Sequence, residues 1–179
     1  MKKVVIISSS LRTNSSSKAL ALKVKEGIEV NNNEVTFIDL KDFNLKFCIG
    51  CLACQTSGKC VIDDDVKKIL DDVSDADILV FASPIYYYSI TGQLKTLLDR
   101  LNPLYVRDNK FKEVYFITTC ADEEISAIQK PITTIEGWIE CFDDVKFVNT
   151  FAGLGVNSFK DLENTNYLEK AYEFGKAIK

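Results

Sequence analysis

Short apolar runs alternate with amphipathic segments along almost the whole chain. The apolar runs are rich in β-branched residues and do not alternate with polar ones, which is typical of parallel strands buried on both faces. They lie at Lys3–Ile7, Glu34–Leu40, Asp77–Ala82, Glu113–Thr119 and Val145–Phe151. Helical spacing of apolar residues predicts helices at Lys18–Ile28, from Asp63 through Val73, at Thr91–Leu101, over most of Asp122–Phe142 with a break or shift near Pro131, and at Asp161–Ile178.

Strands that alternate with helices indicate βαβ units, and therefore a parallel sheet with helices on both faces. The pattern predicts an α/β, flavodoxin-like fold with a five-stranded parallel sheet in the order 2-1-3-4-5. No linker-like boundary interrupts the chain, so we expect residues 1–179 to form one domain with a cysteine-rich loop at about 42–63. Ligands of such sheets bind beyond the carboxyl ends of the strands.

Charge and composition exclude several functions. The net charge is −4 and no basic stripe is present, so we expect no binding to nucleic acid or to anionic membranes. The chain has no histidine, which excludes Ser-His and Cys-His catalysis and zinc sites built on imidazole. No apolar run approaches membrane-spanning length, and the first lysines precede too few apolar residues for a signal peptide. We expect a cytoplasmic protein.

A hydroxyl-rich loop, residues 8–17, joins the first predicted strand to the first predicted helix. Backbone N–H groups at the start of a helix lack partners, and the helix dipole adds positive potential there. Hydroxyl groups and an arginine can add donors and charge for an anion. The loop therefore predicts a binding site for the phosphate of a cofactor, formed by Ser10, Arg12, Ser15, Ser16 and Ser17. The alternative is a solvated turn that only caps the helix.

The same loop lacks both common glycine-rich phosphate motifs. It contains neither G-x-G-x-x-G nor G-x-x-x-x-G-K-[ST]. A dinucleotide fingerprint and a nucleoside-triphosphate loop are therefore both disfavoured.

Two further loops leave predicted strands at the same edge of the sheet. In the first, Pro84 stiffens the backbone, and Tyr86 and Tyr87 can offer apolar edges or stacking to a flat ring. Packing in the core or a subunit interface is the alternative, and it is favoured for Tyr88, whereas ligand contact is favoured for Tyr86. The second loop, Thr118–Ala121, has amides and hydroxyls for the polar edge of a ring, or is an ordinary strand end.

Four of the six cysteines follow the pattern C-x2-C-x2-C-x5-C: Cys48, Cys51, Cys54 and Cys60. Thiolates at this spacing can bind a [4Fe–4S] cluster, and Gly50 and Gly58 permit tight turns around it. Zinc, a redox-active disulfide and thiols that merely pack the loop remain alternatives. Cys120 and Cys141 are expected to be buried thiols without a redox role.

The serine loop, the run from Pro84 to Arg100 and the compact cysteines resemble the NADPH-dependent FMN reductase family, nearest its iron–sulfur flavoprotein branch. The resemblance covers nearly the whole chain, including the tail from Gly153–Val156 to Glu173–Lys176, and it departs from the family pattern at Ser9, where glycine is usual, and at Ser15. It implies that the FMN phosphate is bound by Ser10, Arg12, Asn14, Ser15, Ser16 and Ser17. It also implies isoalloxazine contacts from Pro84, Ile85, Tyr86, Tyr87, Ser89, Thr91, Gly92, Thr118, Thr119, Cys120 and Ala121.

The resemblance further implies an FMN-dependent oxidoreductase in which the flavin itself mediates hydride transfer, with no catalytic side chain. Electrons would pass from NAD(P)H, or from a ferredoxin-like donor through a cluster, to a quinone, free flavin or other small acceptor. Family members are typically homodimers or homotetramers, which makes Leu94–Leu101, Trp138 and the cysteine loop candidate interface surfaces; core packing is favoured for the leucines. A non-catalytic carrier resembling flavodoxin, and a zinc-binding or redox-sensing cysteine module, remain alternatives.

Overall fold

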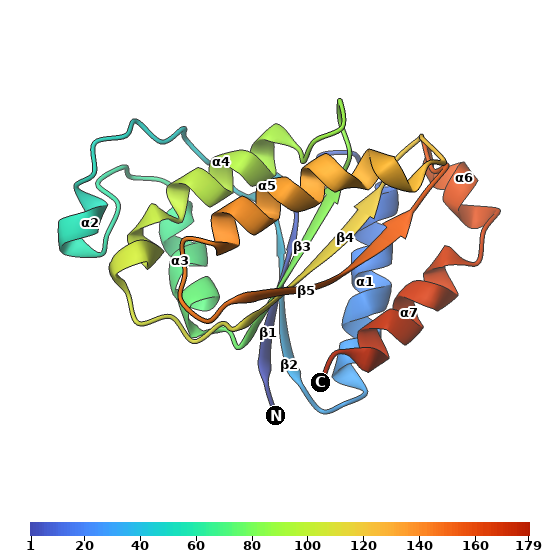
Figure 1. Cartoon of the computed structure of the whole chain (residues 1–179), viewed down its shortest axis with the longest axis horizontal. Coiled ribbons are helices and arrows are strands. Elements are labelled where there is room, and N and C mark those ends of the chain that lie inside the picture. Colours follow the sequence, from blue (N-terminus) through green and yellow to red (C-terminus); the bar gives the residue numbers. More distant parts are fainter.

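The computed structural model describes residues 1–179 and contains one five-stranded parallel sheet. The strand order is β2-β1-β3-β4-β5, and every neighbouring pair is parallel, so the predicted topology is confirmed. The carboxyl ends of all the strands therefore meet at one edge (Figure 1). The strands are β1 (Lys3–Ser8), β2 (Glu34–Asp39), β3 (Ile78–Pro84), β4 (Glu113–Thr119) and β5 (Lys146–Gly153).

Helices cover both faces of the sheet, as Figure 1 shows. One face carries α1 (Ser16–Glu29) and α7 (Tyr167–Ala177), and the other carries α3 (Val66–Asp75), α4 (Gly92–Arg100) and α5 (Gln129–Ile139). None of the helices combines the length and the apolar character needed to cross a bilayer. The short helical elements are η1 (Leu40–Asp42), α2 (Cys54–Ser57), η2 (Asn102–Val106), η3 (Ile125–Ile128) and α6 (Phe159–Glu163).

The sheet separates two hydrophobic cores because successive side chains of a strand point to opposite faces. Val5 and Ile7 of β1 belong to the core beneath α3, α4 and α5, whereas Val4 and Ile6 belong to the core beneath α1 and α7. Trp138 packs edge-on against Phe81 in the first core, with ring centroids 5.6 Å apart. Core packing is likewise confirmed for the leucines of the α4 segment, Leu94, Leu97, Leu98 and Leu101.

The prediction of a single last helix at Asp161–Ile178 is wrong. The structure has two helices there, α6 and α7, with a turn between them. Thr165 explains the break, because its hydroxyl donates to the carbonyl of Leu162 and accepts from the amide of Tyr167. One side chain thus ends the first helix and starts the second, which is how threonine competes with continuous helical bonding.

Pro131 follows a shift from 3₁₀ to α-helix, as the sequence predicts. It lies in the first turn of α5, where its missing N–H group would have had no intrahelical acceptor. The residues before it form the 3₁₀ element η3 instead of α-helix. The proline therefore marks the beginning of α5 and not an interruption of it.

Helices α1 and α7 touch backbone to backbone. A Cβ atom added at Gly27 would lie 2.2 Å from the carbonyl oxygen of Tyr172, and one added at Gly175 would lie 2.2 Å from that of Val24. Neither backbone atom can move away without separating the helices. Glycine is therefore required at this crossing, and the crossing holds α1 at its place on the sheet.

We expect Gly27→Ala to destabilise the protein by about 1–3 kcal/mol through overpacking, although alanine is the better helix former. Gly137→Ala is the matched control, because Gly137 lies in α5 with nothing within 4 Å of the added Cβ atom. That variant should be stabilised by about 0.5–1 kcal/mol. Urea unfolding measures both changes, and equal stability of the two variants would contradict the proposed contact.

Candidate functional site

Four loops meet in one pocket at the carboxyl edge of the sheet. They follow β1, β3, β4 and β5, as expected for ligand sites of this topology. All of the lining residues except Val156 and Asn157 are among those that the sequence predicts to bind a cofactor. The pocket is lined by Ser10, Arg12, Ser15, Ser16, Ser17, Pro84, Ile85, Tyr86, Thr119, Cys120, Ala121, Val156 and Asn157.

One end of the pocket is formed by buried serines at the start of α1. Ser15 caps the helix, since its hydroxyl accepts a hydrogen bond of 3.1 Å from the amide of Lys18. The hydroxyl oxygens of Ser15 and Ser17 lie 3.2 Å apart. The amides of Ser16 and Ser17 donate to no acceptor in the protein. The loop therefore caps the helix and still presents free donors to an anion.

Arg12 connects three of the loops around this end of the pocket. Its guanidinium donates a 2.8 Å hydrogen bond to the carbonyl of Asn157, after β5. It also lies 5.8 Å from the ring centroid of Tyr86, after β3. A positive charge thus stands beside the free amides of α1, which favours an anionic ligand.

Val156 and Asn157 are not among the site residues that the sequence predicts. The signal was available, because the loop after the fifth strand leaves the sheet at the same edge as the other three. A capping box at Ser158 and Asp161 marks the end of that loop.

The proline–tyrosine segment at the end of β3 forms another wall of the pocket. The amide of Ile85 donates to the carbonyl of Thr119, which ties this wall to the loop after β4. Tyr86 and Ser89 exchange backbone hydrogen bonds of 3.0 and 3.1 Å around a two-residue turn. Tyr87 and Tyr88 occupy the turn with φ of 51° and 58°, the sign that a type I′ turn requires.

This turn separates the three tyrosines. Tyr86 lines the pocket, whereas Tyr87 is fully exposed at the tip. Tyr88 is also exposed, and its hydroxyl donates a 3.0 Å hydrogen bond to Asp122. That bond and the carboxylate charge raise the pKa of Tyr88.

Several predicted cofactor residues lie beside the pocket and not in its lining. Thr91 caps α4 and donates to the hydroxyl of Ser9, and Thr118 donates to the carbonyl of Ser83. These buried bonds hold the loops in place. The predicted residues outside the lining are Asn14, Tyr87, Ser89, Thr91, Gly92 and Thr118.

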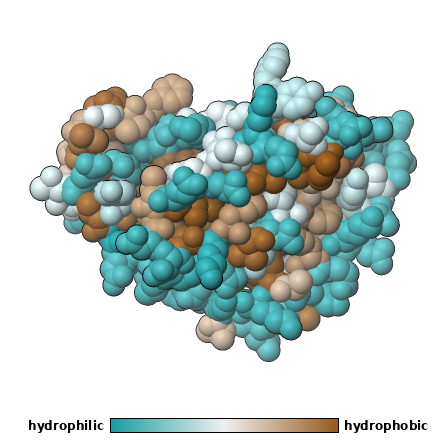
Figure 2. All heavy atoms as spheres, in the orientation of Figure 1, coloured by the Kyte–Doolittle hydropathy of each residue, from teal (hydrophilic) through white to brown (hydrophobic).

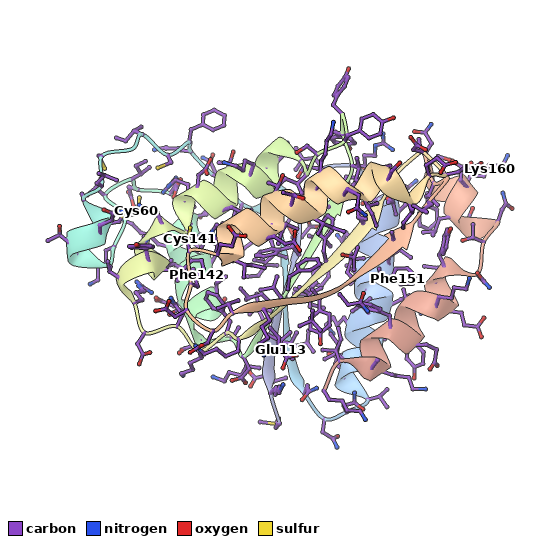
Figure 3. The ribbon with its side chains drawn as sticks, in the orientation of Figure 1. Cys60, Glu113, Cys141, Phe142, Phe151 and Lys160 are labelled. Atoms are coloured by element: carbon purple, nitrogen blue, oxygen red, sulfur yellow. The ribbon has the colours of Figure 1, made fainter.

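The two isolated cysteines differ in environment. Cys120 is buried in the pocket wall, and burial, together with the charge of Asp122, raises the pKa of its thiol. Cys120 is therefore a neutral thiol near pH 7 and not a nucleophile. The prediction that Cys141 is buried is wrong: it is exposed in the turn after α5, as Figure 3 shows, because the buried face of that helix ends at Ile139.

The four clustered cysteines lie on the loop that joins η1 to α3, at the end of the molecule that carries α2 (Figure 1), and they line a second pocket together with Arg100, Asn102 and Pro103. Cys54 is buried, Cys60 is half-buried, and Cys48 and Cys51 are exposed. Gly50 and Gly58 both take positive φ, at 65° and 63°, so the predicted tight turns are present. No three ligand-type side chains of the chain converge as they would around a single metal ion.

Apolar side chains are exposed on the same loop. Figure 2 shows hydrophobic atoms among hydrophilic ones at the end of the molecule that carries α2. The exposed apolar side chains are Phe47, Ile49, Leu52 and Val61, and Phe47 is 78% exposed. We call these four side chains the cysteine-loop patch.

The difference between the two isolated cysteines is testable with iodoacetamide. We expect Cys141 to be alkylated in the native protein at neutral pH much faster than Cys120, which is buried and holds its proton. Mass spectrometry of peptides from timed samples measures both rates. Equal rates in folded protein would contradict the burial of Cys120, and equal rates in denatured protein are the control.

Comparisons with known proteins identify the family and relatives of this chain. Residues 2–129 match the model of the NADPH-dependent FMN reductase family. An iron–sulfur flavoprotein of Methanocaldococcus jannaschii is 40% identical over 102 residues, covering 57% of this chain and 53% of that protein. Another, of Archaeoglobus fulgidus, is 35% identical over 103 residues, covering 58% of this chain and 46% of that protein. The chain thus spans about half the length of these curated relatives.

Solved structures share the fold over nearly the whole chain. An NAD(P)H:quinone oxidoreductase from Methanothermobacter marburgensis superimposes with a TM-score of 0.76 at 16% identity, covering 99% of this chain and 96% of that one. This likeness concerns the arrangement of the elements. The family match over residues 2–129 shows that the chain belongs to the NADPH-dependent FMN reductase family.

Proposed function

We propose that this chain is an FMN-dependent oxidoreductase that moves electrons from NAD(P)H to a small acceptor such as a quinone or free flavin. The observation that carries the proposal is the pocket at the carboxyl edge of the sheet, which brings the anion donors of the serine loop together with a proline–tyrosine wall. A mononucleotide offers a phosphate to the donors and a flat ring to the wall. Membership of the FMN reductase family supports the assignment.

The serine end would bind the FMN phosphate. Free amides of Ser16 and Ser17, nearby hydroxyls and the charge of Arg12 supply several donors to a dianion. No carboxylate lines the pocket, so nothing there repels the phosphate. Hydrogen bonds to a charged group contribute about 1.5–3 kcal/mol each.

The proline–tyrosine wall would hold the ring. Pro84, Ile85 and Tyr86 form one wall, and Thr119–Ala121 form the neighbouring one. Bound FMN would accept electrons as a pair and release them singly, which is chemistry that no side chain of this pocket supplies. The residues would position the ring and limit its contact with water, and Cys120 would remain a neutral wall group.

We further propose a [4Fe–4S] cluster on Cys48, Cys51, Cys54 and Cys60. The four side chains line one pocket, and three of the sulfur atoms already accept hydrogen bonds. Because each cysteine of such a cluster binds a different iron, the sulfur atoms need not converge on one point as they must for zinc. The names of the curated relatives support this assignment, and a ferredoxin-like donor would then reduce the flavin through the cluster.

We also propose a cytoplasmic homodimer or homotetramer. All six cysteines are free, as expected in a reducing compartment. The cysteine-loop patch offers apolar area for contact between subunits.

The phosphate assignment predicts the effect of a double variant. Arg12→Ala with Ser16→Ala removes a charge and a hydroxyl from the pocket, so the Kd for FMN should rise more than tenfold, consistent with about 1.5–3 kcal/mol per bond. Lys23→Ala with Ser126→Ala is the matched control, because it removes a charge from a half-buried position and a hydroxyl from an exposed one, both outside the pocket. Quenching of flavin fluorescence measures the affinity. Unchanged FMN affinity in the first variant would show that the phosphate binds elsewhere.

Reduction of the FMN-bound wild-type protein distinguishes an enzyme from a non-catalytic electron carrier. NAD(P)H added without oxygen should bleach the flavin absorbance of the wild-type protein, and a quinone should restore it. A flavin that dithionite reduces but NAD(P)H does not would identify a flavodoxin-like carrier instead.

A further inference from the structure

The cysteine loop rests on one short segment, residues 100–107, at the end of α4 and in η2. Arg100 is completely buried there and pairs with the buried carboxylate of Asp64, at 2.9 Å from Nη2 to Oδ1. Its Nη1 also donates to the carbonyl of Lys46 at 2.6 Å. The amide of Lys46 donates in turn to Asp64 at 2.8 Å. Arg100 therefore joins the two limbs of the loop just outside its first and last cysteines.

Two side chains of this segment donate to cysteine sulfur. Nδ2 of Asn102 lies 3.1 Å from Sγ of Cys54, and Nη2 of Arg100 lies 3.4 Å from Sγ of Cys60. Nearby, Arg107 donates to the backbone carbonyl of Gly58 at 3.0 Å and so supports the turn between these two cysteines. Residues 100–107 thus hold the cysteine loop in position, and two of its sulfur atoms accept hydrogen bonds from them.

These donors suit a negatively charged sulfur better than a neutral thiol. A thiol is a weak acceptor, whereas a bond to an ionised acceptor is about twice as strong as a neutral one. The Nε atom of Arg100 is buried and has no hydrogen-bond partner in the protein. The arrangement directs amide and guanidinium protons at two of the four sulfur atoms.

We propose that Asn102 and Arg100 are positioning residues that raise the reduction potential of a [4Fe–4S] cluster held by these cysteines. This inference rests on the cluster of the proposed function. Reduction adds one electron from an external donor, and part of the added negative charge lies on the ligand sulfur atoms. Donors to those atoms stabilise the reduced form more than the oxidised form, which raises the potential.

Asn102→Leu tests the proposal because it removes the donor to Cys54 and keeps a side chain of similar size. Asn109→Leu is the matched control. The Asn109 amide donates to the carbonyls of Leu104 and Arg107, at 2.6 and 3.2 Å, and so supports the same segment without touching sulfur. Both variants and the wild type are reconstituted anaerobically with iron and sulfide. Each cluster is then titrated with dithionite and redox mediators and followed by electron paramagnetic resonance.

We expect Asn102→Leu to shift the cluster potential to a more negative value at wild-type iron and sulfide content, and Asn109→Leu to leave it in place. An unchanged potential in Asn102→Leu, or an equal shift in Asn109→Leu, overturns the inference. If Asn102→Leu assembles no cluster, Asn102→Asp replaces it and should also lower the potential. A wild-type protein that takes up no iron and sulfide overturns the proposed cluster itself, a result distinct from an unshifted potential.

Discussion

The reversal of strand order at β1 is the constraint on which the candidate site depends. The chain passes from β1 through α1 to β2 at one edge, and then crosses back to β3 on the other side of β1. The connections after β1 and β3 therefore leave toward opposite faces, since α1 and α4 cover different cores. A crevice remains between them at the carboxyl edge, and the loops after β4 and β5 complete it.

Each loop contributes different chemical groups to that crevice. The first loop ends at a helix start with free amides, and the backbone contact with α7 holds this helix on the sheet. The loop after β3 ends in a tight turn that turns one tyrosine toward the pocket and leaves the next exposed. The cysteine loop is built differently, because its position depends on the buried Arg100–Asp64 pair. Burial alone would raise the pKa of Asp64, but hydrogen bonds from Arg100, Lys46 and Val66 lower it, which keeps the pair ionised.

The fold and most of the pocket could be predicted from sequence, because both follow from periodicity and from the edge at which parallel strands end. What could not be predicted depends on single contacts between distant residues. The helix break at Thr165 occurs because its hydroxyl bonds to nearby backbone groups. The exposure of Tyr87 depends on a turn with positive φ, for which tyrosine is unusual. The burial of Arg100 against Asp64 joins residues far apart in the chain, and no local pattern reveals it.

The central claim is that the serine loop binds the phosphate of a flavin mononucleotide. Comparing the affinities of FMN and riboflavin for the wild-type protein tests it most directly, because the two flavins differ only in that phosphate. Fluorescence quenching should show FMN binding more than tenfold tighter, since each bond to the charged group contributes about 1.5–3 kcal/mol. Equal affinities would contradict the account.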